Sequence, residues 1–374
     1  MKSAVSPQTT VALCSNATIF SENQILRHDI AEKYPGALWV TELIDMLAPQ
    51  RIGAVTGDVA LRQVIAGKLD PSSVWVVQED ISSDADLLIE LGANGKVLIC
   101  CESPLFAANF YQNLKTLSQK FEHCIIFRGS LEDAVPTVKA HVMFFPSFDS
   151  AKYTLDTSWK SRKYLVMVAG NKYWKIRRSI VRGFAANMRD ILYQRPKRFS
   201  NALASAQLHD HRLAAISYFG RRGELDLFGD GWRSLQNLPL RWQNELSATI
   251  TRLNPSPSAN KLATIADYKF ALCFENVKFP GYVTEKLIDC LVAGVVPIYL
   301  GAPDIRDFVP EDCYIDAQKF CSFEQLTDYL EGMSKENWQR VRDCGKSFLN
   351  GNLGNLYSYT GFAERIESML LNEA

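Results

Sequence analysis

The chain has no excess of charge of either sign and no long apolar run. Lysine plus arginine and aspartate plus glutamate are equal at 41 each. A chain without net charge has no global field that would draw it onto nucleic acid or an anionic bilayer. No window approaches the roughly twenty consecutive apolar residues that a membrane-spanning helix needs. We therefore expect neither a nucleic-acid-binding protein nor a transmembrane segment.

The cysteines do not form a recognisable framework. They number nine, an odd count, and no pair has the C-x-x-C spacing of a redox or zinc site. Several lie inside apolar runs, as Cys100, Cys101 and Cys273 do, which is typical of reduced core thiols. The N-terminal segment has the features of neither a signal peptide nor a membrane anchor. These observations predict a cytoplasmic protein, and they leave peripheral association with an inner membrane open.

Common nucleotide and metal motifs are also missing. The sequence contains no G-x-G-x-x-G after a strand, no Walker loop and no H-E-x-x-H. Each of these motifs places backbone amides or ligands at a spacing that its chemistry requires. Their absence argues against a dinucleotide oxidoreductase, a P-loop enzyme and a zinc protease.

Short apolar runs alternate with helical patterns along the whole chain. The predicted strands are 11–14, 74–78, 97–101, 124–127, 142–145, 165–168, 225–228, 268–274, 295–300 and 313–315. The predicted helices are 37–47, 59–66, 85–91, 106–118, 175–191, 208–220, 283–293, 323–333, 335–349 and 360–371. Alternation of this kind predicts βαβ units and parallel sheets.

The length of 374 residues suffices for two domains with separate cores. A polar, aromatic stretch over 148–163 interrupts the alternation and is the predicted linker. The predicted domains are 1–155 and 156–355, followed by a C-terminal segment, 356–374, that would return to the N-terminal domain. The expected fold class is α/β, with two Rossmann-like, doubly wound domains facing across a cleft.

The most informative segment lies between residues 268 and 301. A buried strand ends in a polar loop at Asn276, and Glu285 and Lys286 then begin a helix whose later residues form an apolar stripe. That helix is packed along its body, so its first turn is the part that can meet a ligand. At the carboxyl edge of a parallel sheet, a helix N-terminus beside a lysine is suited to an anion such as a nucleotide diphosphate.

This segment resembles the donor-site signature of the α1,3/1,4-fucosyltransferases, glycosyltransferase family 10. The signature stands here as Tyr268-Lys-Phe-Ala-Leu-Cys-Phe-Glu-Asn276, Tyr282-Val-Thr-Glu-Lys286 and Gly294–Gly301, and 225–231 is similar to another strand and turn of the family. The resemblance implies a GT-B fold and a bacterial-type, inverting enzyme. It would transfer L-fucose from GDP-fucose to a glycan hydroxyl, O3 of N-acetylglucosamine or glucose. No tightly bound cofactor is expected, although a divalent cation could stimulate the reaction.

The resemblance also assigns roles to individual residues. The positions implied to contact the donor are Asn276, Tyr282, Glu285 and Lys286. It places the arginine that neutralises the diphosphate at Arg177, with Arg178 and Arg182 as competitors.

The implied catalytic base is Glu102, which follows the predicted strand 97–101. A sugar hydroxyl is a poor nucleophile, so a carboxylate must take its proton as the new bond forms.

Other interpretations remain open at this point. The donor lobe could serve another GDP- or UDP-sugar transferase, or a protein that binds a nucleotide sugar or glycan without catalysis. Glu285 and Lys286 could simply lie in a solvent-exposed first turn of a helix. Glu102 could be an ordinary loop residue, and Arg177 could lie on a solvent-exposed helix face. Asp84-Ala-Asp86 imitates a metal clamp but is better explained as helix capping, so we predict no metal site.

Overall fold

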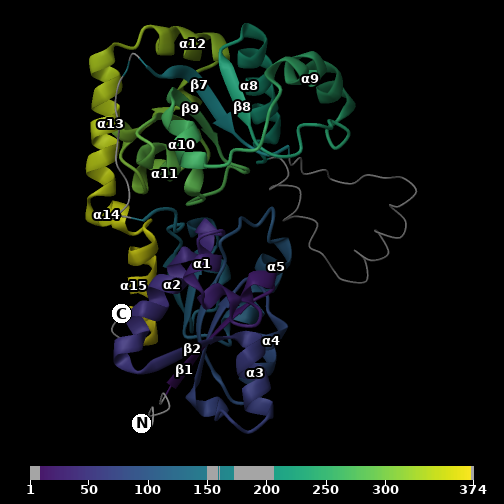
Figure 1. Cartoon of the computed structure of the whole chain (residues 1–374), viewed down its shortest axis with the longest axis vertical. Coiled ribbons are helices and arrows are strands. Elements are labelled where there is room, and N and C mark those ends of the chain that lie inside the picture. The colour runs from purple at the N-terminus through teal and green to yellow at the C-terminus, as the bar shows by residue number, and fades with distance from the viewer. Residues whose placement is uncertain (1–8, 150–158, 160, 172–205, 372–374) are drawn as a thin grey trace. The chain divides into compact units, whose positions relative to one another are not determined.

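The structure is a computed structural model that describes residues 9–149, 159, 161–171 and 206–371. The chain divides into two compact units, Met1–Ala151 with Asn352–Ala374, and Lys152–Gly351. We call them the first and the second unit, and Figure 1 labels their helices and strands. The predicted helix 175–191, with Arg177, Arg178 and Arg182, lies outside the described residues.

The first unit is built on a six-stranded parallel sheet of order β2-β1-β3-β4-β5-β6. Its strands are β1 (Thr9–Ser15), β2 (Ile52–Thr56), β3 (Val74–Glu79), β4 (Asn94–Ile99), β5 (His123–Ile126) and β6 (Lys139–Val142). Its helices are α1 (His28–Ala31), α2 (Leu38–Leu47), α3 (Gly57–Ile65), α4 (Ser83–Glu90), α5 (Ala108–Ser118), α14 (Asn352–Asn355) and α15 (Tyr359–Leu370).

The last helix, α15, belongs to the first unit because it packs against α2. The rings of Trp39 and Phe362 meet edge to face with their centroids 5.3 Å apart, and both side chains are buried. The hydroxyl of Tyr359 donates to the backbone carbonyl of Ser147 at 2.9 Å. Aromatic pairs of this geometry stabilise a contact beyond the apolar area they bury.

Strands β2, β4 and β6 of the first unit differ from the sequence prediction, and β6 spans Lys139–Val142 rather than 142–145. β2 was not predicted, because Gly53 and Ala54 have low strand propensity and most of the strand is only half-buried. β4 spans Asn94–Ile99 rather than 97–101, since Gly95 lets the chain pass close to the next loop. A Cβ atom at Gly95 would lie 1.9 Å from the carbonyl oxygen of Lys120. Glu102 therefore follows the strand by a short loop instead of ending it.

The second unit contains a five-stranded parallel sheet of order β11-β10-β9-β7-β8. Its strands are β7 (Lys163–Val168), β8 (Leu225–Phe228), β9 (Tyr268–Phe274), β10 (Val296–Leu300) and β11 (Ile315–Asp316). Its described helices are α8 (His209–Arg222), α9 (Leu240–Leu253), α10 (Lys261–Ala266), α11 (Glu285–Val292), α12 (Phe323–Glu331) and α13 (Lys335–Leu349). The sequence did not predict α9 and α10.

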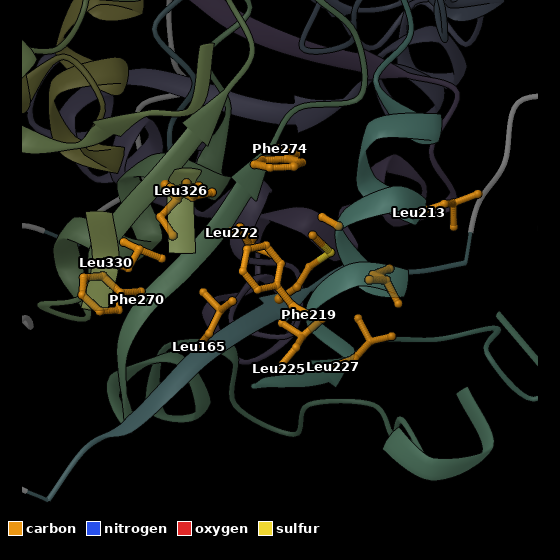
Figure 2. Close-up of a cluster of buried hydrophobic side chains, with 14 of the residues drawn as sticks. Leu165, Leu213, Phe219, Leu225, Leu227, Phe270, Leu272, Phe274, Leu326 and Leu330 are labelled. Atoms are coloured by element: carbon orange, nitrogen blue, oxygen red, sulfur yellow. The ribbon is translucent and has the colours of Figure 1, made fainter. Parts of the chain in front are cut away.

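Strand β9 is buried on both faces, which fixes the position of its carboxyl end. Phe270 and Leu272 belong to an apolar core with Phe219 of α8 and Leu330 of α12 (Figure 2). On the opposite face, the thiol sulfur of Cys273 lies 3.1 Å from that of Cys290 on α11. Since successive side chains of a strand point to opposite faces, α11 covers the face away from α8.

In the described part of the chain, no helix combines the length and the apolar character needed to cross a bilayer.

Candidate functional site

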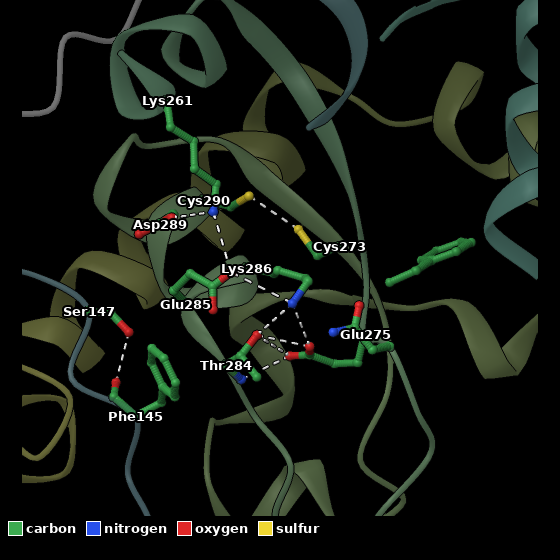
Figure 3. A network of polar contacts seen from close by, with 12 residues as sticks. Phe145, Ser147, Lys261, Cys273, Glu275, Thr284, Glu285, Lys286, Asp289 and Cys290 are labelled. Carbon is green, nitrogen blue, oxygen red and sulfur yellow. Dashed lines mark hydrogen bonds and ion pairs between the residues drawn. The ribbon is translucent and has the colours of Figure 1, made fainter. Parts of the chain in front are cut away.

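The start of α11 is anchored by a buried carboxylate at the end of β9. The side chain of Glu275 has no solvent exposure. Its Oε1 accepts the backbone N–H of Thr284 at 2.8 Å, and the hydroxyl of Thr284 lies 3.0 and 2.9 Å from the two carboxylate oxygens. The ammonium nitrogen of Lys286 lies 3.2 Å from Oε2 (Figure 3). Glu275 thus ties the strand end to the first turn of the helix.

The next strand leaves just enough room for this carboxylate. A Cβ atom at Gly301, directly after β10, would lie 2.6 Å from Cγ of Glu275 and 2.3 Å from the hydroxyl of Tyr299. Only glycine avoids these contacts. The sequence assigned no role to Glu275, although it stands in the quoted motif. Its position directly after a buried strand could have indicated that this carboxylate is buried and holds the loop.

Glu285 and Lys286 form the exposed side of this network. Their charged groups lie 3.6 Å apart, with side-chain exposures of 35% and 18%. Burial opposes the charge of Glu285, but Lys286 and Lys261 outweigh it and lower the pKa of Glu285 to about 2. Burial likewise opposes the charge of Lys286, but Glu275 and Glu285 raise its pKa above the ordinary value. Both groups are therefore charged at neutral pH.

A second ion pair lies behind Glu285. Lys261, the first residue of α10, places its ammonium nitrogen 2.6 Å from Oδ2 of Asp289 and 3.7 Å from Oε1 of Glu285. Burial raises the pKa of Asp289 to about 6, with Glu285 adding to the effect and Lys261 opposing it. Neither Lys261 nor the role of Asp289 was predicted from the sequence.

Asn276 and Tyr282, in the loop between β9 and α11, contact each other, and Arg212 holds Asn276. Arg212 of α8 donates to the carbonyl oxygen of Phe274 at 2.8 Å and to Oδ1 of Asn276 at 2.9 Å. The side-chain amide of Asn276 is 3.5 Å from the hydroxyl of Tyr282, whose side chain is almost fully buried. The structure thus brings together the four described residues that the sequence predicted for the donor, and Arg212 is a residue the sequence missed.

The charges of this cluster balance among the described residues. Its cations are Arg212, Lys261 and Lys286, and its anions are Glu275, Glu285 and Asp289. The sequence predicted a site for an anion here, but these described side chains carry no net positive charge. A diphosphate would therefore need further positive charge, the role that the sequence assigns to Arg177. Among residues 9–149, 161–171 and 206–371, no group of acidic, histidine or cysteine side chains is placed to hold a metal ion.

The predicted base, Glu102, lies in the first unit, in the loop after β4. Its backbone carbonyl accepts the hydroxyl of Tyr111 at 3.1 Å and the thiol of Cys100 at 3.4 Å. Nearby, burial raises the pKa of Glu79 to about 7, with the charge of Glu102 adding to the effect. Glu79 ends β3 and pairs with Ile99 at the end of β4. The sequence did not single out Glu79.

The Asp-x-Asp motif is part of a helix start. Asp84 and Asp86 lie in the first turn of α4, where acidic residues favour the helix dipole. The N-cap is Ser82, whose hydroxyl accepts the backbone N–H of Ala85. Asp86 is paired with Lys120 at 2.5 Å. The helix-start interpretation therefore holds, with Ser82 rather than an aspartate as the cap.

A family model matches the part of the chain that contains this charged cluster. Residues 197–342 match the family model described as "Glycosyltransferase family 10 (fucosyltransferase) C-term". Over this region the chain is similar to the C-terminal part of that family. The matched range includes the whole cluster from Arg212 to Asp289, whereas Glu102 and Arg177 lie outside it.

Two curated relatives show how local the sequence similarity is. The chain is 40% identical over 95 residues to an α-(1,4)-fucosyltransferase of Arabidopsis thaliana, covering 24% of this chain and 23% of the relative. It is 41% identical over 73 residues to an α-(1,3)-fucosyltransferase, FucT, of Helicobacter pylori, covering 19% of this chain and 15% of the relative. The aligned part is thus less than a quarter of each relative's length.

The fold similarity extends over the whole chain. A solved glycosyltransferase from Rickettsia africae ESF-5 superposes with a TM-score of 0.57 at 10% identity, covering 98% of this chain and 100% of that one. The two parallel α/β units have the GT-B fold that the sequence predicted.

Proposed function

We propose that this protein is an inverting glycosyltransferase that transfers L-fucose from GDP-fucose to a glycan hydroxyl, O3 of N-acetylglucosamine or glucose. The observation that carries the proposal is the buried network of Glu275, Lys286 and Glu285 at the start of α11. It lies in the region that matches family 10. The names of the two relatives support fucose as the transferred sugar and a 3- or 4-hydroxyl as its acceptor.

In this proposal, the second unit binds the donor. Lys286 and the backbone N–H groups of the first turn of α11 would meet the diphosphate, since a helix N-terminus favours negative charge. Arg177 would add the positive charge that the balanced cluster lacks. Negative charge grows on the leaving GDP as its bond to fucose breaks, so donors fixed in advance stabilise the transition state most.

The first unit would bind the acceptor, and Glu102 would act as the base. It would take the proton of the acceptor hydroxyl while the oxygen attacks the anomeric carbon of fucose from the side opposite GDP. That attack inverts the configuration at the carbon. The hydrogen bond from Tyr111 to the carbonyl of Glu102 supports this role, because it fixes the backbone that carries the carboxylate.

The remaining expectations belong to the same proposal. The acceptor domain would be 1–155, the donor domain 156–355 and the returning segment 356–374. The bacterial-type enzyme would act in the cytoplasm or as a peripheral protein at the inner membrane. It would need no tightly bound cofactor, and a divalent cation could stimulate it by shielding the diphosphate.

The test is turnover of the purified full chain with GDP-fucose and a library of defined acceptors. We expect GDP release that depends on an acceptor with a terminal or substituted N-acetylglucosamine or glucose, and mass spectrometry with linkage analysis would identify the product. GDP-mannose and UDP-sugars in parallel reactions test the choice of donor.

Three outcomes would contradict the proposal. Transfer from a UDP-sugar but not from GDP-fucose would show a related transferase with another donor. Binding of GDP-fucose without turnover on any acceptor would favour a non-catalytic binding protein. The absence of both GDP release and calorimetric binding of GDP-fucose would contradict the proposed donor and the proposed reaction.

A further inference from the structure

Lys261 is a half-buried lysine that the donor signature does not explain. It begins the short helix α10, which is capped by Asn260 through a 3.0 Å bond from the backbone N–H of Ala263 to Oδ1. Its side chain is 32% exposed, and it reaches across to α11 to meet Asp289 and Glu285. Figure 3 shows the ammonium group between these two carboxylates.

Glu285 and Asp289 would repel each other without this contact. They are four residues apart on α11, so their side chains are neighbours on one helix face, and like charges at this spacing are destabilising. Asp289 is only 10% exposed, so solvent screens the repulsion poorly. An ammonium group between them removes the repulsion and gives each carboxylate a partner.

Lys261 also determines where the charge of Glu285 can point. Oε1 of the Glu285 carboxylate lies 3.6 Å from the ammonium nitrogen of Lys286 and 3.7 Å from that of Lys261. Two cations at this one oxygen restrict the rotation of the carboxylate and keep it ionised. An ionised carboxylate repels phosphate, so its complementary ligand is a hydroxyl group that donates a hydrogen bond.

We propose that Lys261 is a positioning residue that holds the Glu285 carboxylate in place to accept hydrogen bonds from hydroxyl groups of the bound nucleotide sugar. Asp289 anchors Lys261 for this purpose. The proposal rests on the proposed function, because it assumes a nucleotide-sugar donor at α11. The hydroxyl groups belong either to the ribose or to the transferred sugar, and different ligands distinguish these two sources.

The test compares wild type with Lys261→Met, which keeps the length of the side chain and removes its charge. The affinities for pyrophosphate, GDP and GDP-fucose are measured by calorimetry or by inhibition of transfer. We expect the affinity of Lys261→Met for pyrophosphate to stay within about twofold of wild type. Its affinity for a ligand whose hydroxyl groups bind Glu285 should fall about tenfold, which is the effect of losing about one hydrogen bond to a charged group. If only GDP-fucose binds more weakly, the hydroxyl groups belong to the transferred sugar. If GDP also binds more weakly, they belong to the ribose.

Two further variants separate positioning from folding. Lys261→Arg keeps the charge and should restore the affinity for GDP-fucose to within about threefold of wild type. Lys278→Met is the control, since that exposed lysine contacts Gln318 at 2.6 Å and is not part of the cluster. Thermal melting of each variant shows whether it is folded.

The inference is overturned if Lys261→Met leaves all three affinities unchanged, or if it weakens pyrophosphate as much as GDP-fucose. The second result would make Lys261 one more cation for the diphosphate. Failure of the wild-type chain to bind GDP-fucose would instead contradict the proposed function.

Discussion

The ammonium nitrogen of Lys286 lies 3.2 Å from Oε2 of Glu275, a carboxylate without solvent exposure. This contact joins the end of β9 to the beginning of α11. A buried carboxylate is unfavourable unless cations and hydrogen-bond donors surround it, and Thr284 and Lys286 supply both here. The position of Lys286 at the candidate donor site therefore depends on a residue that would not touch the donor itself.

Glu275→Gln tests this dependence. The amide keeps the shape but leaves Lys286 without its buried partner, so we expect the free energy of unfolding to fall by about 2–4 kcal/mol. GDP should also bind more weakly. Urea denaturation and calorimetry measure the two effects. Glu311→Gln is a matched control, because Glu311 pairs with Arg306 at 3.1 Å on the surface and its loss should leave the urea midpoint unchanged. Equal midpoints for both variants would contradict the account.

Gly301→Ala tests the packing around Glu275. The added methyl group would overlap Cγ of Glu275 and the hydroxyl of Tyr299, so we expect destabilisation by about 1–3 kcal/mol and weaker GDP binding. Gly36→Ala is the control, since a Cβ atom there meets nothing within 4 Å. Thermal melting and calorimetry report the outcome. A Gly301→Ala protein as stable as Gly36→Ala would show that the loop adapts.

Glu102→Gln tests the proposed base. The amide cannot accept the proton of the acceptor hydroxyl, so we expect kcat to fall by at least about a hundredfold. The affinity for GDP should stay within about twofold, because the donor cluster lies in the other unit. Steady-state kinetics and calorimetry measure the two quantities. A variant that retains most of the wild-type kcat would exclude Glu102 as the base.

Glu79 makes stability depend on pH in a direction that can be measured. Its pKa of about 7 in the folded protein lies above the value of roughly 4.3 in an unfolded chain. Between these values the folded state holds a proton that the unfolded state has lost, so this group's contribution to stability falls as the pH rises towards 7. Glu79→Gln should remove this pH-dependent loss of stability. Urea denaturation at about pH 5 and about pH 8 would show a smaller decrease for the variant than for wild type. The same decrease in both proteins would contradict the assignment.

The sequence predicted the part of the fold in which local pattern and burial agree. Strand β9 was predicted with its observed bounds, because both its faces are buried and its residues form one apolar run. Strand β2 was missed because it is half-buried and contains Gly53. Helix α10 was missed because it is short and follows a segment rich in proline and serine, where periodicity gives no signal.

The candidate site was predictable only in part, for a similar reason. Neighbours in sequence, such as Glu285 and Lys286, could be identified from the motif. The contacts that hold them could not, because Lys261 and Glu275 come from other elements and meet α11 only after the sheet has formed. Hydrogen-bond partners at this range depend on packing, which a single sequence does not specify.

The measurement that tests the central claim most directly is the calorimetric titration of GDP into wild type, Lys286→Met and Lys278→Met. If the first turn of α11 binds the diphosphate, wild type binds GDP, Lys286→Met binds it at least about tenfold more weakly, and Lys278→Met stays within about twofold of wild type. Equal affinities for wild type and Lys286→Met, or no binding of GDP to wild type, would contradict the assignment of this site.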